Sequence, residues 1–187
     1  MTFRRPAKRE WDEKSLYEYA VGALGRRMRT VAELKRLMRT RMGSQPGGDA
    51  MMEAVVARLK EQRYLNDTSF ATAYSSYRKD NEKFGRLRVV QDLKAKGVHA
   101  NVIEKAIGSA YAGVNEEKLA REYLQRKRIK APEDQKQAAR VFRTLARGGF
   151  SSRVIVSILK HWHVDDETVS LLEQERTERE EHPESED

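Results

Sequence analysis

One local sequence pattern occurs twice in full and a third time in part, and this repetition limits the fold more than any other feature. The stretch 97–107 matches the stretch 149–159, which lies 52 positions later, in its glycine and in its paired apolar residues. Val55, Val56 and Leu59 supply a third, partial copy. Each copy follows a segment of helical spacing that ends in basic residues and glycine, a typical helix stop. One such unit cannot bury its apolar residues alone, so the pattern predicts stacked repeats.

Helical spacing also dominates the rest of the chain, because apolar pairs recur three and four residues apart, and we find no credible strand. We therefore predict an all-α fold, an elongated and curved, solenoid-like array of three tandem three-helix repeats of about 50 residues each. The expected organisation is a flexible basic N-terminus at 1–14, repeat 1 at 15–65 with a loop insertion at 43–48, repeat 2 at 66–114, repeat 3 at 115–164, and a disordered acidic tail at 165–187.

Polar residues mark where several of these helices begin. Asp67 and Asn115 are placed to cap the helices that follow them, and Ser151 is placed to cap the last helix of repeat 3. The motif that begins at Tyr64 and Leu65 is interpreted as structural rather than as a binding site. In this interpretation Tyr64 and Leu65 close repeat 1, and Phe70 begins a buried face.

The helix predicted near 133–147 separates its side chains into two stripes. Four apolar residues fall within an arc of about 100° when successive residues are placed 100° apart, and three arginines fall on another side. The expected core stripe is Ala138, Val141, Phe142 and Leu145, and the basic stripe is Arg140, Arg143 and Arg147.

Charge is distributed unevenly along the 187 residues, whose net charge is +8. The segment 173–187 has eight acidic and two basic residues, so it carries −6 and the rest of the chain carries +14. Such a basic body favours polyanions or acidic protein surfaces as partners, although basic runs on helices are also common as plain solvated faces. The acidic segment is interpreted as a solubilising tail, with competition for the basic surface as the alternative.

The sequence gives little support for a catalytic or a metal-binding function. The chain has no cysteine, which excludes disulfides, thiol nucleophiles and thiolate metal sites. Among the four histidines, His161 and His163 are the one close pair, and on a helix their side chains diverge. No nucleophile elbow or phosphate-binding glycine loop occurs. We therefore expect no enzyme activity, no cofactor and no metal.

No stretch of the sequence has the apolar length of a signal peptide or a membrane span. We therefore expect a cytoplasmic protein without membrane contact, and a monomer by default.

At this point the residues resemble a known family, the RecX regulators of the bacterial RecA recombinase. The family signature reads approximately Tyr-Leu-Asp-Asp-x-x-Phe-Ala, then Gly, Arg-Ile, Glu-Leu and Lys-Gly-Ile. At matching spacing this chain has Tyr64-Leu65-Asn66-Asp67, Phe70-Ala71, Gly85, Arg88-Val89, Asp92-Leu93 and Lys96-Gly97-Val98. The triple three-helix array looks like the family fold from end to end, with repeat 1 least similar and its loop at 43–48 longer than expected.

The resemblance implies that the protein binds the RecA filament on single-stranded DNA, lies in the filament groove and modulates recombinase, ATPase and coprotease activity, usually by inhibition. It supplies no contact residues, so the candidate surface is chosen by charge alone. The candidate binding residues are Arg86, Arg88, Lys94, Lys96, Arg126, Lys127, Arg128, Lys130, Arg140, Arg143 and Arg147.

Two alternatives stay open. The first is a basic helical-repeat protein that binds single- or double-stranded DNA directly, weakly and without sequence preference. Against it, no helix offers a cluster suited to base edges, and aromatic stacking platforms are sparse. The second is a helical scaffold for a different partner.

Overall fold

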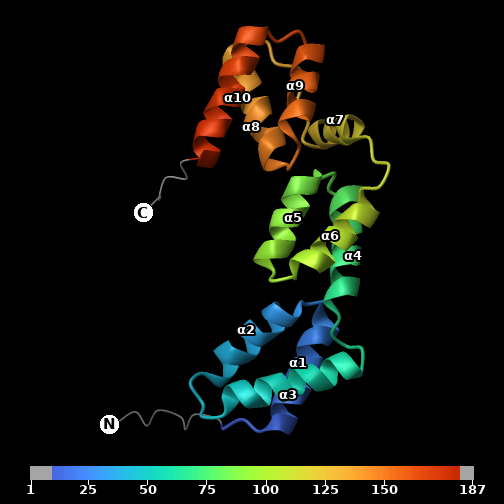
Figure 1. The fold of residues 1–187 in the computed structure, drawn as a ribbon, viewed down its shortest axis with the longest axis vertical. Coiled ribbons are helices and arrows are strands. Elements are labelled where there is room, and N and C mark those ends of the chain that lie inside the picture. Colours follow the sequence, from blue (N-terminus) through green and yellow to red (C-terminus); the bar gives the residue numbers. More distant parts are fainter. Residues whose placement is uncertain (1–9, 182–187) are drawn as a thin grey trace, which may run out of the picture. The chain divides into compact units, whose positions relative to one another are not determined.

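The computed structural model describes residues 10–181, and within this range it contains ten α-helices and no strand (Figure 1). The helices are α1 (Glu13–Arg26), α2 (Val31–Met42), α3 (Gly48–Glu61), α4 (Asp67–Asp80), α5 (Arg86–Ala95), α6 (Ala100–Ala110), α7 (Glu116–Arg126), α8 (Gln135–Arg147), α9 (Ser152–His161) and α10 (Asp166–Glu181). The prediction of an all-α helical repeat fold is confirmed. Of the N-terminus predicted at 1–14, residues 1–9 lie outside the described range.

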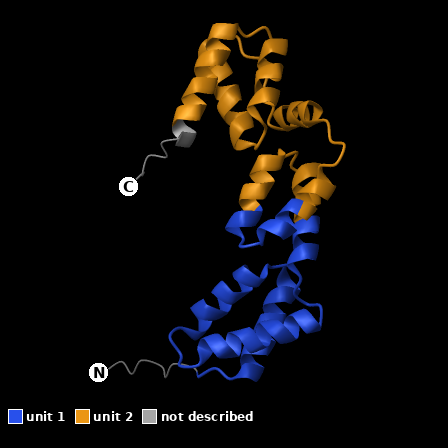
Figure 2. Cartoon of the chain, in the orientation of Figure 1, with its two compact units in different colours: residues 1–73, 93–104 blue, residues 74–92, 105–187 orange. Residues whose placement is uncertain are grey.

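The helices form two compact units, shown in two colours in Figure 2. The first unit contains residues 1–73 and 93–104, and the second contains 74–92 and 105–187. The division falls within α4, α5 and α6, so the segment 66–114 contributes to both units.

The first unit is built around the apolar faces of α1, α2 and α3. Leu16, Leu34, Met38 and Leu59 are completely buried there. Asp12 caps α1 through a capping box with Ser15, which explains why α1 begins inside the segment predicted as flexible.

The second unit has its own core, to which α7, α8, α9 and α10 contribute. The predicted core stripe of α8 is confirmed, because Ala138, Val141, Phe142 and Leu145 are all buried. Arg140, predicted to lie on a basic stripe away from the core, is exposed in the structure.

The disordered tail predicted at 165–187 is wrong for most of its length, because α10 extends from Asp166 to Glu181. Two of its apolar side chains, Val169 and Leu172, are buried in the core of the second unit. The acidic composition hid these two anchors, which lie three residues apart and therefore on one face of the helix. Residues 182–187 lie outside the described range.

Two of the three predicted helix caps are also wrong. Asn115 does cap α7, since its side chain accepts a hydrogen bond from Lys118 N–H. At the start of α4, however, Asn66 is the capping residue, and Asp67 accepts a hydrogen bond from Val31 N–H at the start of α2. Ser151 makes no capping bond and instead contacts Glu116 of α7.

The start of α2 is joined to the turn that precedes α6, and we call this contact the first junction. Thr30 Oγ1 donates a hydrogen bond of 2.7 Å to the carbonyl of Lys96, and Lys96 Nζ lies 2.9 Å from Glu33 Oε1. Gly97 has a positive φ of 75°, and a Cβ added to it would lie 2.4 Å from Ala32 Cβ. All of these residues belong to the first unit.

The start of α5 is joined in the same way to the turn that precedes α9, and we call this contact the second junction. Gly85 N–H donates to the carbonyl of Gly148 at 2.8 Å, and Leu87 N–H donates to that of Gly149 at 3.1 Å. Gly149 has a φ of 85°, and a Cβ there would lie 2.2 Å from the backbone nitrogen of Arg88. This junction lies in the second unit and brings α5 against the α8–α9 turn.

Candidate binding surface

Nine of the eleven candidate basic residues are exposed, and Arg88 and Lys96 are half-buried. Lys94 and Lys96 belong to the first unit, and the other nine belong to the second. The exposed residues are Arg86, Lys94, Arg126, Lys127, Arg128, Lys130, Arg140, Arg143 and Arg147.

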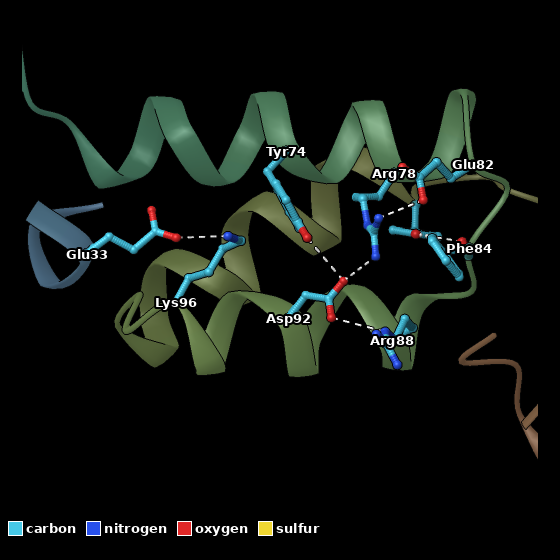
Figure 3. Close-up of polar contacts among 9 residues, drawn as sticks. Glu33, Tyr74, Arg78, Glu82, Phe84, Arg88, Asp92 and Lys96 are labelled. Atoms are coloured by element: carbon cyan, nitrogen blue, oxygen red, sulfur yellow. Dashed lines mark hydrogen bonds and ion pairs between the residues drawn. The ribbon is translucent and has the colours of Figure 1, made fainter. Parts of the chain in front are cut away.

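Lys96 takes part in the first junction through its ion pair with Glu33 (Figure 3). Burial alone would raise the pKa of Glu33, but hydrogen bonds from Lys96 and from Thr30 N–H outweigh it and hold that pKa below its ordinary value of 4.5. The ammonium group of Lys96 therefore has a structural role inside the first unit.

A polar cluster that the sequence did not reveal lies between α4 and α5 in the second unit (Figure 3). Arg78 pairs with Glu82 at 2.6 Å and with Asp92 at 2.7 Å, and its guanidinium lies 4.2 Å from the centre of the Phe84 ring. Asp92 also accepts a hydrogen bond from the Tyr74 hydroxyl at 3.1 Å. Residues 78 and 92 are too far apart in sequence for helical spacing to pair them.

The charge state of this cluster follows from burial and pairing. Desolvation by burial raises the pKa of Tyr74 to about 12, although the charge of Arg78 opposes the rise. Burial works in the opposite direction on Arg78, but its hydrogen bond to Asp92 outweighs burial and raises the pKa of that guanidinium. At neutral pH Arg78 is therefore charged and the Tyr74 hydroxyl keeps its proton.

Asp92 also orients one of the candidate residues. Its second carboxylate oxygen lies 3.0 Å from Arg88 Nε, one helical turn earlier on α5. Arg88 and Asp92 are four residues apart, so this contact was accessible from the sequence as a helical ion pair.

Three candidate residues meet at a cavity of about 510 Å³ in the second unit. We call it the arginine cavity, and it lies between α5, α8 and α10. Its lining residues are Leu87, Arg88, Gln91, Phe142, Arg143, Ala146, Arg147, Gly149, Leu172, Glu175 and Arg176. Arg88, Arg143 and Arg147 are among the residues predicted from charge, whereas Arg176 and Glu175 are not, because the acidic composition around them is typical of a disordered tail.

The remaining candidates of the second unit do not line this cavity. Arg126, Lys127 and Arg128 stand at the end of α7, where Arg126 donates a hydrogen bond to the carbonyl of Asn81. Lys127 Nζ lies 5.7 Å from the centre of the Tyr123 ring. The eleven residues therefore form several local groups, one of which lines the arginine cavity.

The site offers charge and shape for binding. Among the side chains that the structure describes, no cluster of histidine and acidic residues could hold a metal ion. None of the described helices has the length and apolar character needed to cross a membrane.

Comparison with known proteins identifies the family. A family model described as the second three-helix domain of RecX matches residues 66–107. Regulatory protein RecX of Deinococcus radiodurans is 32% identical over 152 residues, which cover 81% of this chain and 70% of the relative. Regulatory protein RecX of Chromobacterium violaceum is 30% identical over 153 residues, which cover 82% of this chain and 94% of the relative.

Solved structures share the fold. The crystal structure of RecX from Lactobacillus salivarius superposes with a TM-score of 0.62 at 18% identity, covering 81% of this chain and 96% of that one. A second crystal structure of a regulatory protein RecX gives a TM-score of 0.65 at 20% identity, covering 80% and 71%. From its sequence relatives and from the helical repeat that it shares with these structures, the chain belongs to the RecX family of regulatory proteins.

Proposed function

We propose that this protein binds the RecA filament assembled on single-stranded DNA and modulates its recombinase, ATPase and coprotease activities, usually by inhibition. The proposal extends the family membership, which supports a regulatory protein. The observation that supports a basic binding surface is that nine of the eleven candidate basic residues are exposed to solvent. Binding across neighbouring subunits of a filament would hinder their rearrangement or release, which requires no chemistry by the regulator.

The direct test adds the purified protein to RecA filaments on single-stranded DNA and follows both binding and ATP hydrolysis. We expect stoichiometric binding and a reduced rate of ATP hydrolysis. Absence of both effects at stoichiometric protein would contradict the proposal.

Charge reversal locates the surface. Changing Arg140, Arg143 and Arg147 together to Glu should weaken filament binding by about tenfold or more, because charged contacts at an interface act through complementary potentials. The matched control reverses three exposed basic residues of the first unit, Arg26, Arg36 and Lys60, and changes the net charge by the same amount. Equal losses in both variants would indicate general electrostatic attraction instead of a located surface.

A second candidate function, direct and non-specific DNA binding, is favoured by the exposed basic group at the end of α7. Its signature is salt dependence, since each phosphate neutralised on duplex DNA contributes about 0.9 to the slope of log affinity against log salt. DNA without RecA therefore belongs in the same experiment. Tight binding there, with the same affinity whether or not RecA is present, would favour this function over filament binding.

A further inference from the structure

The arginine cavity combines a charged rim with an aliphatic lining, and its residues come from three helices that are distant in sequence. We infer that it binds an acidic peptide segment in which an aliphatic side chain lies between carboxylates. This goes beyond the proposed function, because it states the ligand chemistry of one cavity independently of which protein supplies the peptide.

The charge of the lining selects an anion. Four guanidinium groups, those of Arg88, Arg143, Arg147 and Arg176, line the cavity together with one carboxylate, that of Glu175. All four cations are arginine, whose planar fork donates two parallel hydrogen bonds to one carboxylate, whereas lysine offers a single point charge. Arginine clusters recognise acidic motifs in peptides in this way.

The apolar part of the lining determines which ligand side chain can lie beside the bound carboxylate. Leu87 and Ala146 offer accessible aliphatic atoms, and Leu87 is 43% exposed, whereas Leu172 is buried in the core. Among the lining residues Phe142 is the one aromatic side chain, and it is only 3% exposed. Bases of single-stranded nucleic acid commonly stack on aromatic rings, and this cavity presents no open ring for them. The lining therefore favours an aliphatic peptide side chain over single-stranded nucleic acid.

Two of the guanidinium groups have contacts within the protein that restrict their motion before any ligand binds. Arg88 Nε is paired with Asp92 at 3.0 Å, and Asp92 is itself fixed by Arg78. Arg147 Nε donates a hydrogen bond of 3.3 Å to the carbonyl of Arg143. Side chains that are already ordered lose less conformational freedom on binding, which favours affinity for a short peptide. The volume of about 510 Å³ lies in the range of small-ligand pockets.

The test uses the full chain and fluorescence anisotropy of two labelled peptides, Glu-Glu-Leu-Glu-Glu and Glu-Glu-Ser-Glu-Glu, which have equal charge. We expect the leucine peptide to bind several times more tightly, because its aliphatic group is removed from water. Changing Arg143 and Arg147 to Ala should reduce its affinity by about tenfold or more. The control variant changes Arg26 and Arg36 to Ala, two exposed arginines of the first unit, which removes the same charge outside the cavity and should leave the affinity within about twofold.

Leu87→Ser tests the aliphatic contact separately. Because Leu87 lies outside the buried core, with 43% of it exposed, the variant should fold. It should abolish most of the preference for the leucine peptide while retaining affinity for the serine peptide. A preference that survives Leu87→Ser unchanged would contradict the role of Leu87.

A pair of glutamates in α10, Glu175 and Glu178, gives the sharpest comparison. Glu175 lines the arginine cavity and Glu178 does not, so Glu175→Gln and Glu178→Gln make the same chemical change at different places. Glu175→Gln should raise the affinity for the leucine peptide by about two- to fivefold, because it removes a like charge beside the bound carboxylates. Glu178→Gln should change it less. Equal gains would show that only net charge matters and would overturn the inference.

A labelled oligothymidine is the third probe. If it binds more tightly than the leucine peptide and loses affinity in the Arg143 and Arg147 variant, the cavity is a nucleic-acid site and the inference is wrong. Failure of this inference is distinguishable from failure of the proposed function, because RecA filament binding is measured on the same proteins. Normal filament binding without peptide binding would remove the peptide site and leave the proposed function intact.

Discussion

The two junctions make the same connection with different chemistry. In the first, side chains join the parts, with Thr30 donating to the carbonyl of Lys96 and Lys96 pairing with Glu33. In the second, backbone amides donate to backbone carbonyls from Gly85 to Gly148 and from Leu87 to Gly149. Lys96 and Gly148 each precede the glycine of positive φ in their own turn. The same connection between helices can therefore be made by side-chain bonds in one repeat and by backbone bonds in the next.

The difference also has a consequence for the candidate surface. Glu33 is the third residue of α2, and Arg88 is the third residue of α5. In the first junction this position holds an acid that neutralises Lys96. In the second junction the backbone makes the connection, and the equivalent position holds a cation that pairs with Asp92 and lines the arginine cavity.

The largest effect is expected from Gly149→Ala. A Cβ at this position meets the backbone of Arg88 and also requires a conformation of positive φ, so the second junction cannot close without moving backbone. We expect a loss of about 2–5 kcal/mol in the free energy of unfolding. Urea denaturation followed by circular dichroism measures it.

Gly113→Ala is the control, because Gly113 also has a positive φ, of 66°, but has no neighbour within 4 Å of an added Cβ. It should cost only the conformational part, about 1–2 kcal/mol. If Gly149→Ala cost no more than this control, the close approach at the second junction would not limit stability.

A smaller effect is expected from Gly97→Ala at the first junction, about 2–4 kcal/mol, because the added Cβ meets a side chain instead of backbone. The double variant with Ala32→Gly removes the atom that the new Cβ would strike, so it should be more stable than Gly97→Ala alone. A double-mutant cycle by urea denaturation measures this coupling. If the losses in stability from Gly97→Ala and Ala32→Gly were strictly additive, the contact between the two positions would be contradicted. No corresponding second substitution exists at the second junction, because the Cβ at Gly149 meets backbone atoms of Arg88.

The smallest effect is expected from Glu33→Gln, about 0.5–1 kcal/mol at neutral pH, since both partners of the ion pair remain partly exposed. The folded-state pKa of Glu33 is lowered, so its contribution is complete above the ordinary value of 4.5 and is lost as the pH falls through the folded-state pKa. The stabilities of wild type and Glu33→Gln, measured in urea at several pH values, should therefore converge in acid. A difference that persists in acid would assign the effect to packing.

The helices and the core of the array were predictable because their signals are local. Periodicity identified the buried stripe of α8, and Phe142 and Leu145 are buried as expected. The errors arose where a residue acts on a distant helix. Asp67 contacts the start of α2 instead of capping its own helix, and Ser151 contacts Glu116. No propensity within one helix reveals such contacts.

The candidate site was predictable only in its charge. Composition selected Arg88, Arg143 and Arg147, but their meeting at one cavity depends on the second junction and on the packing of α10. The acidic run in α10 obscured Val169 and Leu172, whose burial brings Arg176 and Glu175 to the same place.

The backbone bonds of the second junction also create a natural reporter. The amide protons of Gly85 and Leu87 are held by carbonyls more than sixty residues later in the chain. Opening of the turn before α9 therefore releases amides at the start of α5, and their exchange with solvent deuterium records the cooperativity of two segments that are remote in sequence. Two resonances in a nitrogen–proton spectrum would thus follow the integrity of the turn at Gly148 and Gly149 while a partner binds.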